Sequence, residues 1–444
     1  MPDNLTPVEV EVSFAPPRMS SIRWRICALL FFATTINYMD RQVLGVLAPM
    51  LQVKIGWTEV QYGYIVVAFQ AAYALGLLVV GGIIDAIGVR LGYALAIGIW
   101  SLAAMSHALA RSALTFGVSR FFLGLGESGS FPAAIKTVAE WFPKKERALA
   151  TGILNCGTNF GATLVPLVVP WIAVTIGWQW AFLFTGGFSL IWLVTWLSTY
   201  KSAEYHPKIR PSEFAHIRSD PPESTTKVPW IRLIGYRQTW ALLIGKGLTD
   251  PVWWFLLFWL PKYFSSEFGI KLTGLALPLV IIYNVAAVGS IFGGWLPALC
   301  IRMGLSVKAA RRMAMLLCAV AVMPVMFIGN IHGLGLAIAI ISLAGAAHQG
   351  WSANIYTLIS DIFPRSAVGS VTGIAGFGGA IGGMIAAWAV GHVLQRSHQY
   401  GGLFIACGLA YIVALGIIQV MVPKNDQVRA LEQNQSDYIP RRNG

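Results

Sequence analysis

The sequence predicts an all-α membrane protein in which twelve transmembrane helices form two pseudo-symmetric bundles of six. Of its 444 residues, 56% are hydrophobic and only 11% are charged, against about 25% charged in an average soluble domain. Long apolar stretches recur, many of them reaching the roughly 20 residues that span a bilayer core. Lipid satisfies no backbone hydrogen bonds, so these stretches are expected to be helices. A sequence block in the first half also recurs in the second.

The apolar stretches divide the chain into bundles, tails and a linker. We expect a tail over 1–20, a bundle over 21–200, a linker over 201–238, a second bundle over 239–422 and a tail over 423–444. The linker is rich in Pro, Ser and both charges, which is typical of a connection outside the membrane. The predicted helices cover 21–47, 60–84, 88–109, 112–139, 148–173, 178–200, 239–264, 273–299, 308–330, 333–360, 367–394 and 401–422.

The positive charges behind the net charge of +13 lie mainly in the segments on one side of the membrane. With the first tail inside, the internal segments carry 23 Lys and Arg and the external ones carry five. This asymmetry follows the positive-inside rule and predicts two cytoplasmic termini, without any need for nucleic acid as a partner. Residues 1–20 lack an apolar core, so we expect no cleavable signal peptide. The five cysteines have no spacing typical of a disulfide framework or a metal site.

The internal repeat relates residues 140–152 to residues 361–373. EWFPKKERALATG aligns with DIFPRSAVGSVTG, and the same offset relates Gly157 and Gly161 to Gly378 and Gly382. A repeat of whole bundles is typical of transporters whose halves move about a central site. Glycines four residues apart let helices approach closely, so packing is the expected role of these pairs.

Six charged residues lie inside predicted spans. They are Asp40, Arg41, Arg120, Glu127, Lys246 and Asp250. Each costs at least about 2.5–3.5 kcal/mol at mid-bilayer, so we expect them to face a shared interior. Adjacent helical residues point about 100° apart, so Asp40 and Arg41 each need a partner elsewhere. Residues 120 and 127 share a face but lie about 10 Å apart along the axis, and a substrate group or a side chain from the first helix could fill that gap.

Three cations and three carboxylates make the empty interior neutral. Protonation of one carboxylate would leave a charge of +1, which an anion would balance. The site would then import an acid together with a proton. Structural alternatives remain. The charges of Asp40 with Arg41 and of Arg120 with Glu127 could pin helices together. Lys246 and Asp250, four residues apart, could form an ion pair with one another.

Uncharged polar residues also lie in the predicted spans. Asn159 and, on the tenth helix, His348 and Asn354 could contact a hydroxyl-rich substrate or form hydrogen bonds between helices. The aromatic run at 253–259 is expected mainly to pack and to contact lipid, although Trp253 or Trp254 could instead stack on a sugar ring. Asp85 and Arg90, in a turn after the second helix, could form a gating latch or simply be solvated.

The turn GGIIDAIGVRLG resembles the loop signature of the major facilitator superfamily. Within that superfamily the chain resembles the anion:cation symporters, and bacterial hexuronate transporters above all. Four blocks carry this resemblance: NYMDRQ, residues 120–152, LTDPVWWFLLFWLPKYF and AHQGWSANIYTLISDIFP. It implies the major facilitator fold in a bacterial inner membrane and proton-coupled uptake of glucuronate or galacturonate by alternating access.

The resemblance also assigns roles to residues. Asp40 and Glu127 are the expected proton-coupling residues, and Arg41 and Arg120 are the expected carboxylate anchors. The other candidate substrate residues are Tyr38, Tyr73, Asn159, Lys246, Asp250, Trp253, His348 and Asn354. The expected partners are a small organic anion, protons and the lipid bilayer, for a monomer without a cofactor or metal.

Rival functions remain open at this point. A symporter or exchanger for another organic anion, such as galactonate or an aromatic carboxylate, would use the same charges. Drug efflux is disfavoured because three buried cations suit an anion. We expect no enzyme, since the sequence has no visible nucleophile–base pair, metal cluster or phosphate loop.

Overall fold

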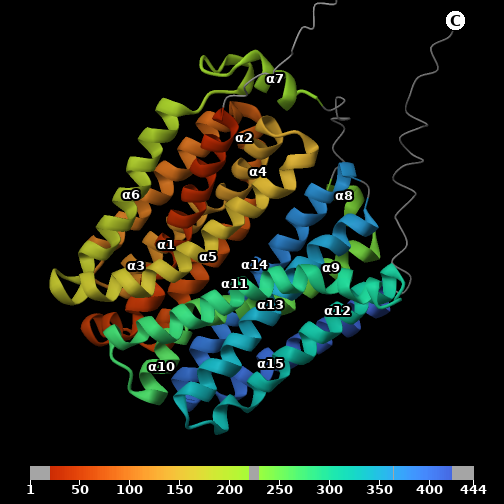
Figure 1. Cartoon of the computed structure of the whole chain (residues 1–444). Coiled ribbons are helices and arrows are strands. Elements are labelled where there is room, and N and C mark those ends of the chain that lie inside the picture. The colour runs from red at the N-terminus through yellow and green to blue at the C-terminus, as the bar shows by residue number, and fades with distance from the viewer. Residues whose placement is uncertain (1–20, 220–229, 364, 423–444) are drawn as a thin grey trace, which may run out of the picture.

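The computed structural model describes residues 21–219, 230–363 and 365–422, which form helices joined by short connections (Figure 1). The first group is α1 (Ile22–Ile55), α2 (Glu59–Ser106), α3 (Ala113–Glu127), α4 (Ser130–Trp141), α5 (Lys144–Thr175) and α6 (Trp178–Thr199). The linker contains α7 (Pro211–Ile217) and α8 (Trp230–Leu233). The second group is α9 (Arg237–Phe258), α10 (Leu260–Phe268), α11 (Ala276–Arg302), α12 (Val307–Val322), α13 (Leu334–Ile362), α14 (Arg365–Ser397) and α15 (Gly401–Met421). The all-helical prediction is confirmed.

Within these ranges, nine helices are long and apolar enough to cross a membrane. The helix α2 counts once although it contains two of the predicted spans, 60–84 and 88–109. The polar stretch NYMDRQ lowers the hydropathy of α1, and α3 and α4 are each shorter than 18 residues. With α1, with α3–α4 as one broken span and with α2 divided in two, the helices match the twelve predicted spans.

The division of α2 lies at Gly88. Two helical segments meet in a kink at this residue, where Gly88 has φ of 81° and ψ of 162°, a conformation that residues with a Cβ rarely adopt. No neighbouring atom lies within 4 Å of the position that a Cβ would take. The backbone conformation, rather than a lack of space, therefore requires glycine at this turn.

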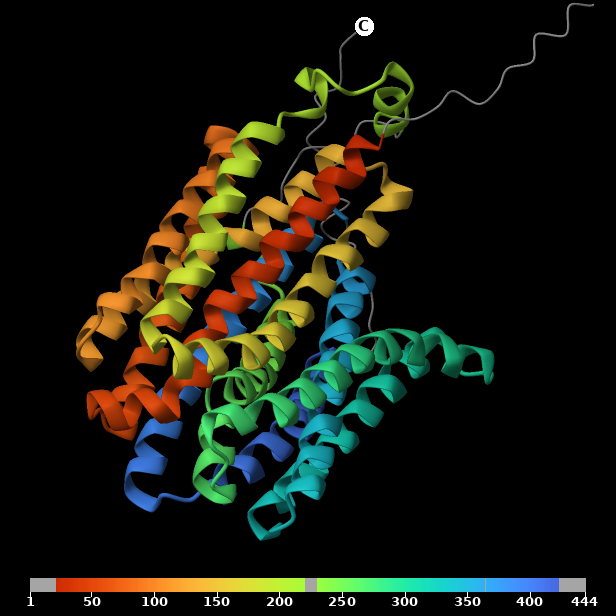
Figure 2. The same cartoon turned by 60° about the vertical axis from the view of Figure 1, so that its left-hand side comes forward.

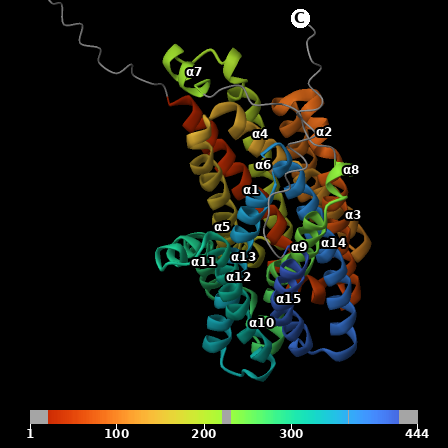
Figure 3. The same cartoon turned by 90° about the vertical axis from the view of Figure 1, so that its right-hand side faces the viewer.

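We call α1–α6 the amino-terminal half and α9–α15 the carboxy-terminal half. In the first, α1 packs on α5 and α6, and α2 packs on α3, α4 and α6; in the second, α9 packs on α14 and α15, and α13 packs on α11 and α12. Figure 2 shows the two groups side by side, and Figure 3 shows them from a third direction.

The predicted glycine pairs lie in two equivalent helix contacts. A Cβ on Gly157 or Gly161 of α5 would overlap atoms of Thr34 or Thr35 on α1. A Cβ on Gly378 or Gly382 of α14 would overlap the backbone of α9. Both pairs therefore let two helices approach to backbone contact.

Gly382→Ala is expected to destabilise the fold, because its new methyl group would overlap the carbonyl oxygen of Gly247. Overpacking of this kind costs about 1–3 kcal/mol. The matched control is Gly416→Ala on α15, where nothing lies within 4 Å of the added Cβ. Thermal unfolding of the two purified variants in the same detergent measures the difference, and an equal melting temperature would show that the close approach is unnecessary.

The two halves are joined toward the end of the bundle at which α1 finishes, which we call the Ile55 end. Glu59 of α2 forms an ion pair with Lys262 of α10. The Tyr62 hydroxyl donates to the Phe258 carbonyl at 2.7 Å, and the Glu59 backbone N–H donates to Gln395 Oε1 at 3.0 Å. These contacts tie α2 to α9, α10 and α14.

The opposite end, which we call the Ile22 end, has ion pairs within each half and with the linker. Arg23 of α1 lies 3.0 Å from Glu146 of α5 and 3.1 Å from Glu213 of α7, so α7 packs over the beginning of α1 (Figure 2). In the carboxy-terminal half, Arg311 of α12 pairs with Asp361 of α13 at 3.0 Å.

Candidate functional site

Asp40 and Arg41 lie in the middle of α1 and point to different helices. Asp40 is buried, and its Oδ2 accepts a hydrogen bond from the Ser189 hydroxyl of α6 at 2.7 Å. Ser189 in turn accepts from the Trp100 indole N–H at 3.2 Å. The second carboxylate oxygen of Asp40, Oδ1, is buried and has no hydrogen-bond partner among the described residues.

Arg41 pairs with Glu127 at the end of α3. Its Nε and one terminal nitrogen each lie 2.7 Å from Glu127 Oε2, and both side chains are at most 4% exposed. The helix α3 ends at Glu127, and α4 begins at Ser130. The other carboxylate oxygen of Glu127, Oε1, is buried and has no partner in the part of the chain that the structure describes. A side chain from the first helix thus fills the gap that the spacing of Arg120 and Glu127 predicted.

Arg120 contacts the backbone of Arg41 rather than its side chain. One terminal nitrogen donates to the backbone carbonyl of Arg41 at 2.8 Å, and the other is buried without a partner. The Arg120 guanidinium carbon is 5.6 Å from the ring centre of Phe69 and 5.7 Å from that of Phe258. Two arginines and two carboxylates therefore lie together in the amino-terminal half, and three of them, Asp40, Glu127 and Arg120, each keep one buried polar atom without a partner among the described residues.

Four aromatic rings surround the guanidinium of Arg41. Its central carbon lies 4.8 Å from the ring centre of Tyr38, 5.1 Å from that of Tyr73, 5.2 Å from that of Phe69 and 5.2 Å from that of Trp254. Such contacts stabilise a cation by its attraction to the ring face. Trp254 belongs to α9, so the carboxy-terminal half contributes one of the four rings.

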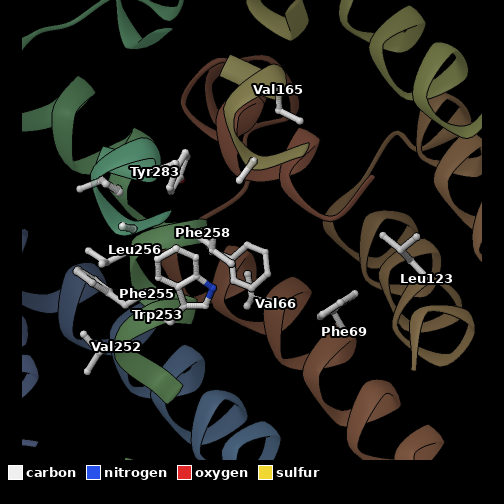
Figure 4. Close-up of a cluster of buried hydrophobic side chains, with 14 of the residues drawn as sticks. Val66, Phe69, Leu123, Val165, Val252, Trp253, Phe255, Leu256, Phe258 and Tyr283 are labelled. Carbon is white, nitrogen blue, oxygen red and sulfur yellow. The ribbon is translucent and has the colours of Figure 1, made fainter. Parts of the chain in front are cut away.

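Of the two candidate tryptophans, only Trp254 contacts Arg41. Trp253 is buried, and it stacks on His348 with ring centres 5.4 Å apart and an interplanar angle of 3°. Figure 4 shows Trp253 among buried side chains of α9, and its ring centre lies 6.2 Å from that of Tyr283 on α11. The geometry gives Trp253 a packing role and leaves Trp254 as the aromatic residue beside the charges.

Lys246 and Asp250 form the direct pair that their spacing predicted. The Lys246 Nζ lies 2.9 Å from Asp250 Oδ2 and 3.1 Å from Oδ1. The same Nζ lies 4.9 Å from the ring centre of Tyr356 on α13. Sequence reasoning missed Tyr356, whose only signal was its place two residues after Asn354.

The remaining polar candidates mainly join helices. His348 Nδ1 lies 2.6 Å from the Tyr411 hydroxyl of α15. The Asn354 amide donates at 2.8 Å to the Gly293 carbonyl of α11 and to the Gly350 carbonyl of its own helix, which leaves its buried Oδ1 unpartnered. Asn159 of α5 is half-buried. His348 and Asn354 therefore form hydrogen bonds between helices, which is one of the two uses predicted for them.

The candidate latch residues, Asp85 and Arg90, contact other helices of the amino-terminal half. Asp85 pairs with Lys136 of α4 at 2.7 Å, and Arg90 donates to the Leu197 carbonyl of α6 at 2.5 Å. Lys136 is not among the residues that the sequence singled out. The structure thus links α2 to α4 and α6 at this end.

Comparison with known proteins agrees with this architecture. Residues 30–387 match the Major Facilitator Superfamily. The chain is 29% identical to the hexuronate transporter of Escherichia coli K12 over 95% of this chain and 99% of that protein. It is 31% identical to the galacturonate transporter of Dickeya chrysanthemi over 64% of this chain and 83% of that one, and 28% identical to the D-galactonate transporter of Escherichia coli O6:H1 over 93% and 96%.

The fold also resembles a solved structure. A bacterial homologue of the human lysosomal transporter Spinster, in an inward-facing and unoccupied conformation, aligns with a TM-score of 0.67 and 17% identity over 92% of this chain and 97% of that one. This likeness concerns the fold alone. With the family match over most of the chain, it follows that this protein belongs to the Major Facilitator Superfamily of membrane transporters.

Proposed function

We propose that the protein imports a sugar-acid anion, a hexuronate above all, together with a proton by alternating access. The observation that carries this proposal is the buried Arg41–Glu127 pair, with Arg120 on the Arg41 carbonyl. Protonation of Glu127 removes the charge that holds Arg41 and frees its guanidinium for the carboxylate of a substrate. Proton binding and anion binding then favour one another.

The residue roles follow from this linkage. Arg41 and Arg120 anchor the substrate carboxylate, since guanidinium groups match carboxylates in two-point hydrogen bonds. Glu127 and Asp40 take up the proton, and each retains one buried oxygen without a partner. Tyr38, Tyr73 and the Lys246–Asp250 pair offer hydroxyl and charged groups to the rest of the sugar.

The direction of transport depends on which end of the bundle faces the cytoplasm. The positive-inside rule assigns the Ile22 end to the cytoplasm of a bacterial inner membrane. The contacts between Glu59, Tyr62 and the carboxy-terminal half then close the external side. In this arrangement, the bound substrate would leave toward the cytoplasm.

Uptake by proteoliposomes tests the proposal. The full chain is reconstituted, an inward proton gradient is imposed, and accumulation of labelled glucuronate and galacturonate is measured against galactonate and an aromatic carboxylate. We expect hexuronate to accumulate only with the gradient. Transport that requires a counter-substrate inside would indicate an exchanger, and accumulation of another acid alone would replace hexuronate as the substrate.

A further inference from the structure

We infer that the site prefers sugar acids with one carboxylate over those with two, and that Asp250 sets this preference. The inference rests on the proposed function and names the class of substrate within it. Hexuronates and aldonates carry one carboxylate, whereas aldarates carry one at each end. The feature that separates them is the charge that the carboxy-terminal half presents to the far end of the sugar.

One face of α9 brings this charge close to Arg41. Lys246, Asp250 and Trp254 are spaced by four residues and therefore share a helix face. The Trp254 ring centre lies 5.2 Å from the Arg41 guanidinium carbon. Asp250 is one helical turn, about 5.4 Å along the axis, from this tryptophan. The Lys246–Asp250 pair thus lies on the helix face that presents Trp254 to Arg41, one and two turns before the tryptophan.

Tyr356 adds an aromatic ring beside the α9 pair. Its ring centre lies 4.9 Å from the Lys246 ammonium, and two further tyrosines, Tyr38 and Tyr73, flank Arg41 in the other half. Tyr356 is 45% exposed, so its ring is available to a molecule between the halves.

The carboxylate is the more accessible member of the α9 pair. The Asp250 side chain is 20% exposed and that of Lys246 only 5%. A Cβ on Gly379 of α14 would overlap Asp250 Oδ2, so glycine at that position makes room for the carboxylate. Lys246 is already neutralised by both oxygens of Asp250. The far end of a substrate therefore meets an acceptor that suits hydroxyl groups and repels a second carboxylate.

The charge balance of the interior gives the same result. The spans contribute Arg41, Arg120 and Lys246 against three carboxylates, which are Asp40, Glu127 and Asp250. One bound proton compensates one substrate carboxylate. A second carboxylate has no cation left to balance it, and a buried unpaired charge is strongly unfavourable.

The test compares each hexuronate with the aldarate of the same sugar, which carries a second carboxylate in place of the aldehyde carbon that closes the hexuronate ring. Dissociation constants of the purified full chain are measured at neutral pH by calorimetry for glucuronate against glucarate, and for galacturonate against galactarate. For at least one pair we expect the wild type to bind the hexuronate at least tenfold more tightly. Asp250→Asn leaves Lys246 unneutralised, so the ratio should fall by tenfold or more.

Two further variants make the outcome decisive. Lys246→Gln leaves the carboxylate alone and should shift the ratio in the opposite direction, which decides the question if Asp250→Asn does not fold. Asp361→Asn removes a carboxylate that pairs with Arg311 outside the site and should leave the ratio unchanged. Absence of sugar-acid binding in the wild type would contradict the proposed function. Hexuronate binding with a wild-type ratio near one, or with ratios that neither variant shifts, would contradict this inference alone.

Discussion

Glu127→Gln is expected to abolish accumulation of the sugar acid under an imposed proton gradient while leaving exchange of labelled for unlabelled substrate. Glutamine keeps the size of the side chain, and its carbonyl can still accept from Arg41, which lies 2.7 Å from Glu127 Oε2 in the wild type. It cannot take up or release a proton. The variant would resemble the permanently protonated state, in which Arg41 is free to bind the anion.

The measurement uses one preparation of proteoliposomes for both assays. Accumulation is followed after a pH jump, and exchange is followed with excess substrate inside and no gradient. The control is Glu204→Gln, which removes an exposed carboxylate paired with Arg218 in the linker. Normal gradient-driven accumulation by Glu127→Gln would exclude Glu127 as the coupling residue. Loss of both activities in a correctly folded variant would instead indicate a structural role for the pair.

Much of the charged site was predictable because helix geometry restricts where neighbouring residues can point. The spacing of Arg120 and Glu127 predicted a gap, and Arg41 of α1 fills it. The spacing of Lys246 and Asp250 predicted a direct pair, which the structure contains. In each case the argument needed only the rise and the angle per residue.

The partners that sequence reasoning missed depend on how separate helices are rotated against one another. Ser189 donates to Asp40 from α6, but a serine in an apolar span carries no sign of its partner. Lys136 of α4 pairs with Asp85, which lies just before the turn at Gly88, and the sequence gives no sign of how α4 is placed against that turn. Trp253 and Trp254 are adjacent in sequence, and only the packing of His348 against Trp253 decides which of them faces Arg41.

Arg41→Ala and Arg120→Ala are both expected to weaken sugar-acid binding, but only the first should also disturb proton coupling. A charge-assisted hydrogen bond contributes about 1.5–3 kcal/mol, which corresponds to roughly 10-fold to 150-fold in the dissociation constant. Arg41→Ala also leaves the buried Glu127 carboxylate without its cation. Arg120→Ala leaves that pair in place, since Arg120 contacts the backbone carbonyl of Arg41.

The two variants can therefore be separated by the pH dependence of binding. In Arg120→Ala, affinity should fall while its dependence on pH keeps the wild-type shape, because Glu127 still exchanges its proton against the charge of Arg41. In Arg41→Ala, both the affinity and the shape should change. Arg396→Ala on the exposed end of α14 controls for loss of a positive charge elsewhere. Wild-type affinity in both site variants would rule out the two arginines as anchors, and a wild-type pH profile in Arg41→Ala would show that proton and anion are not linked through this ion pair.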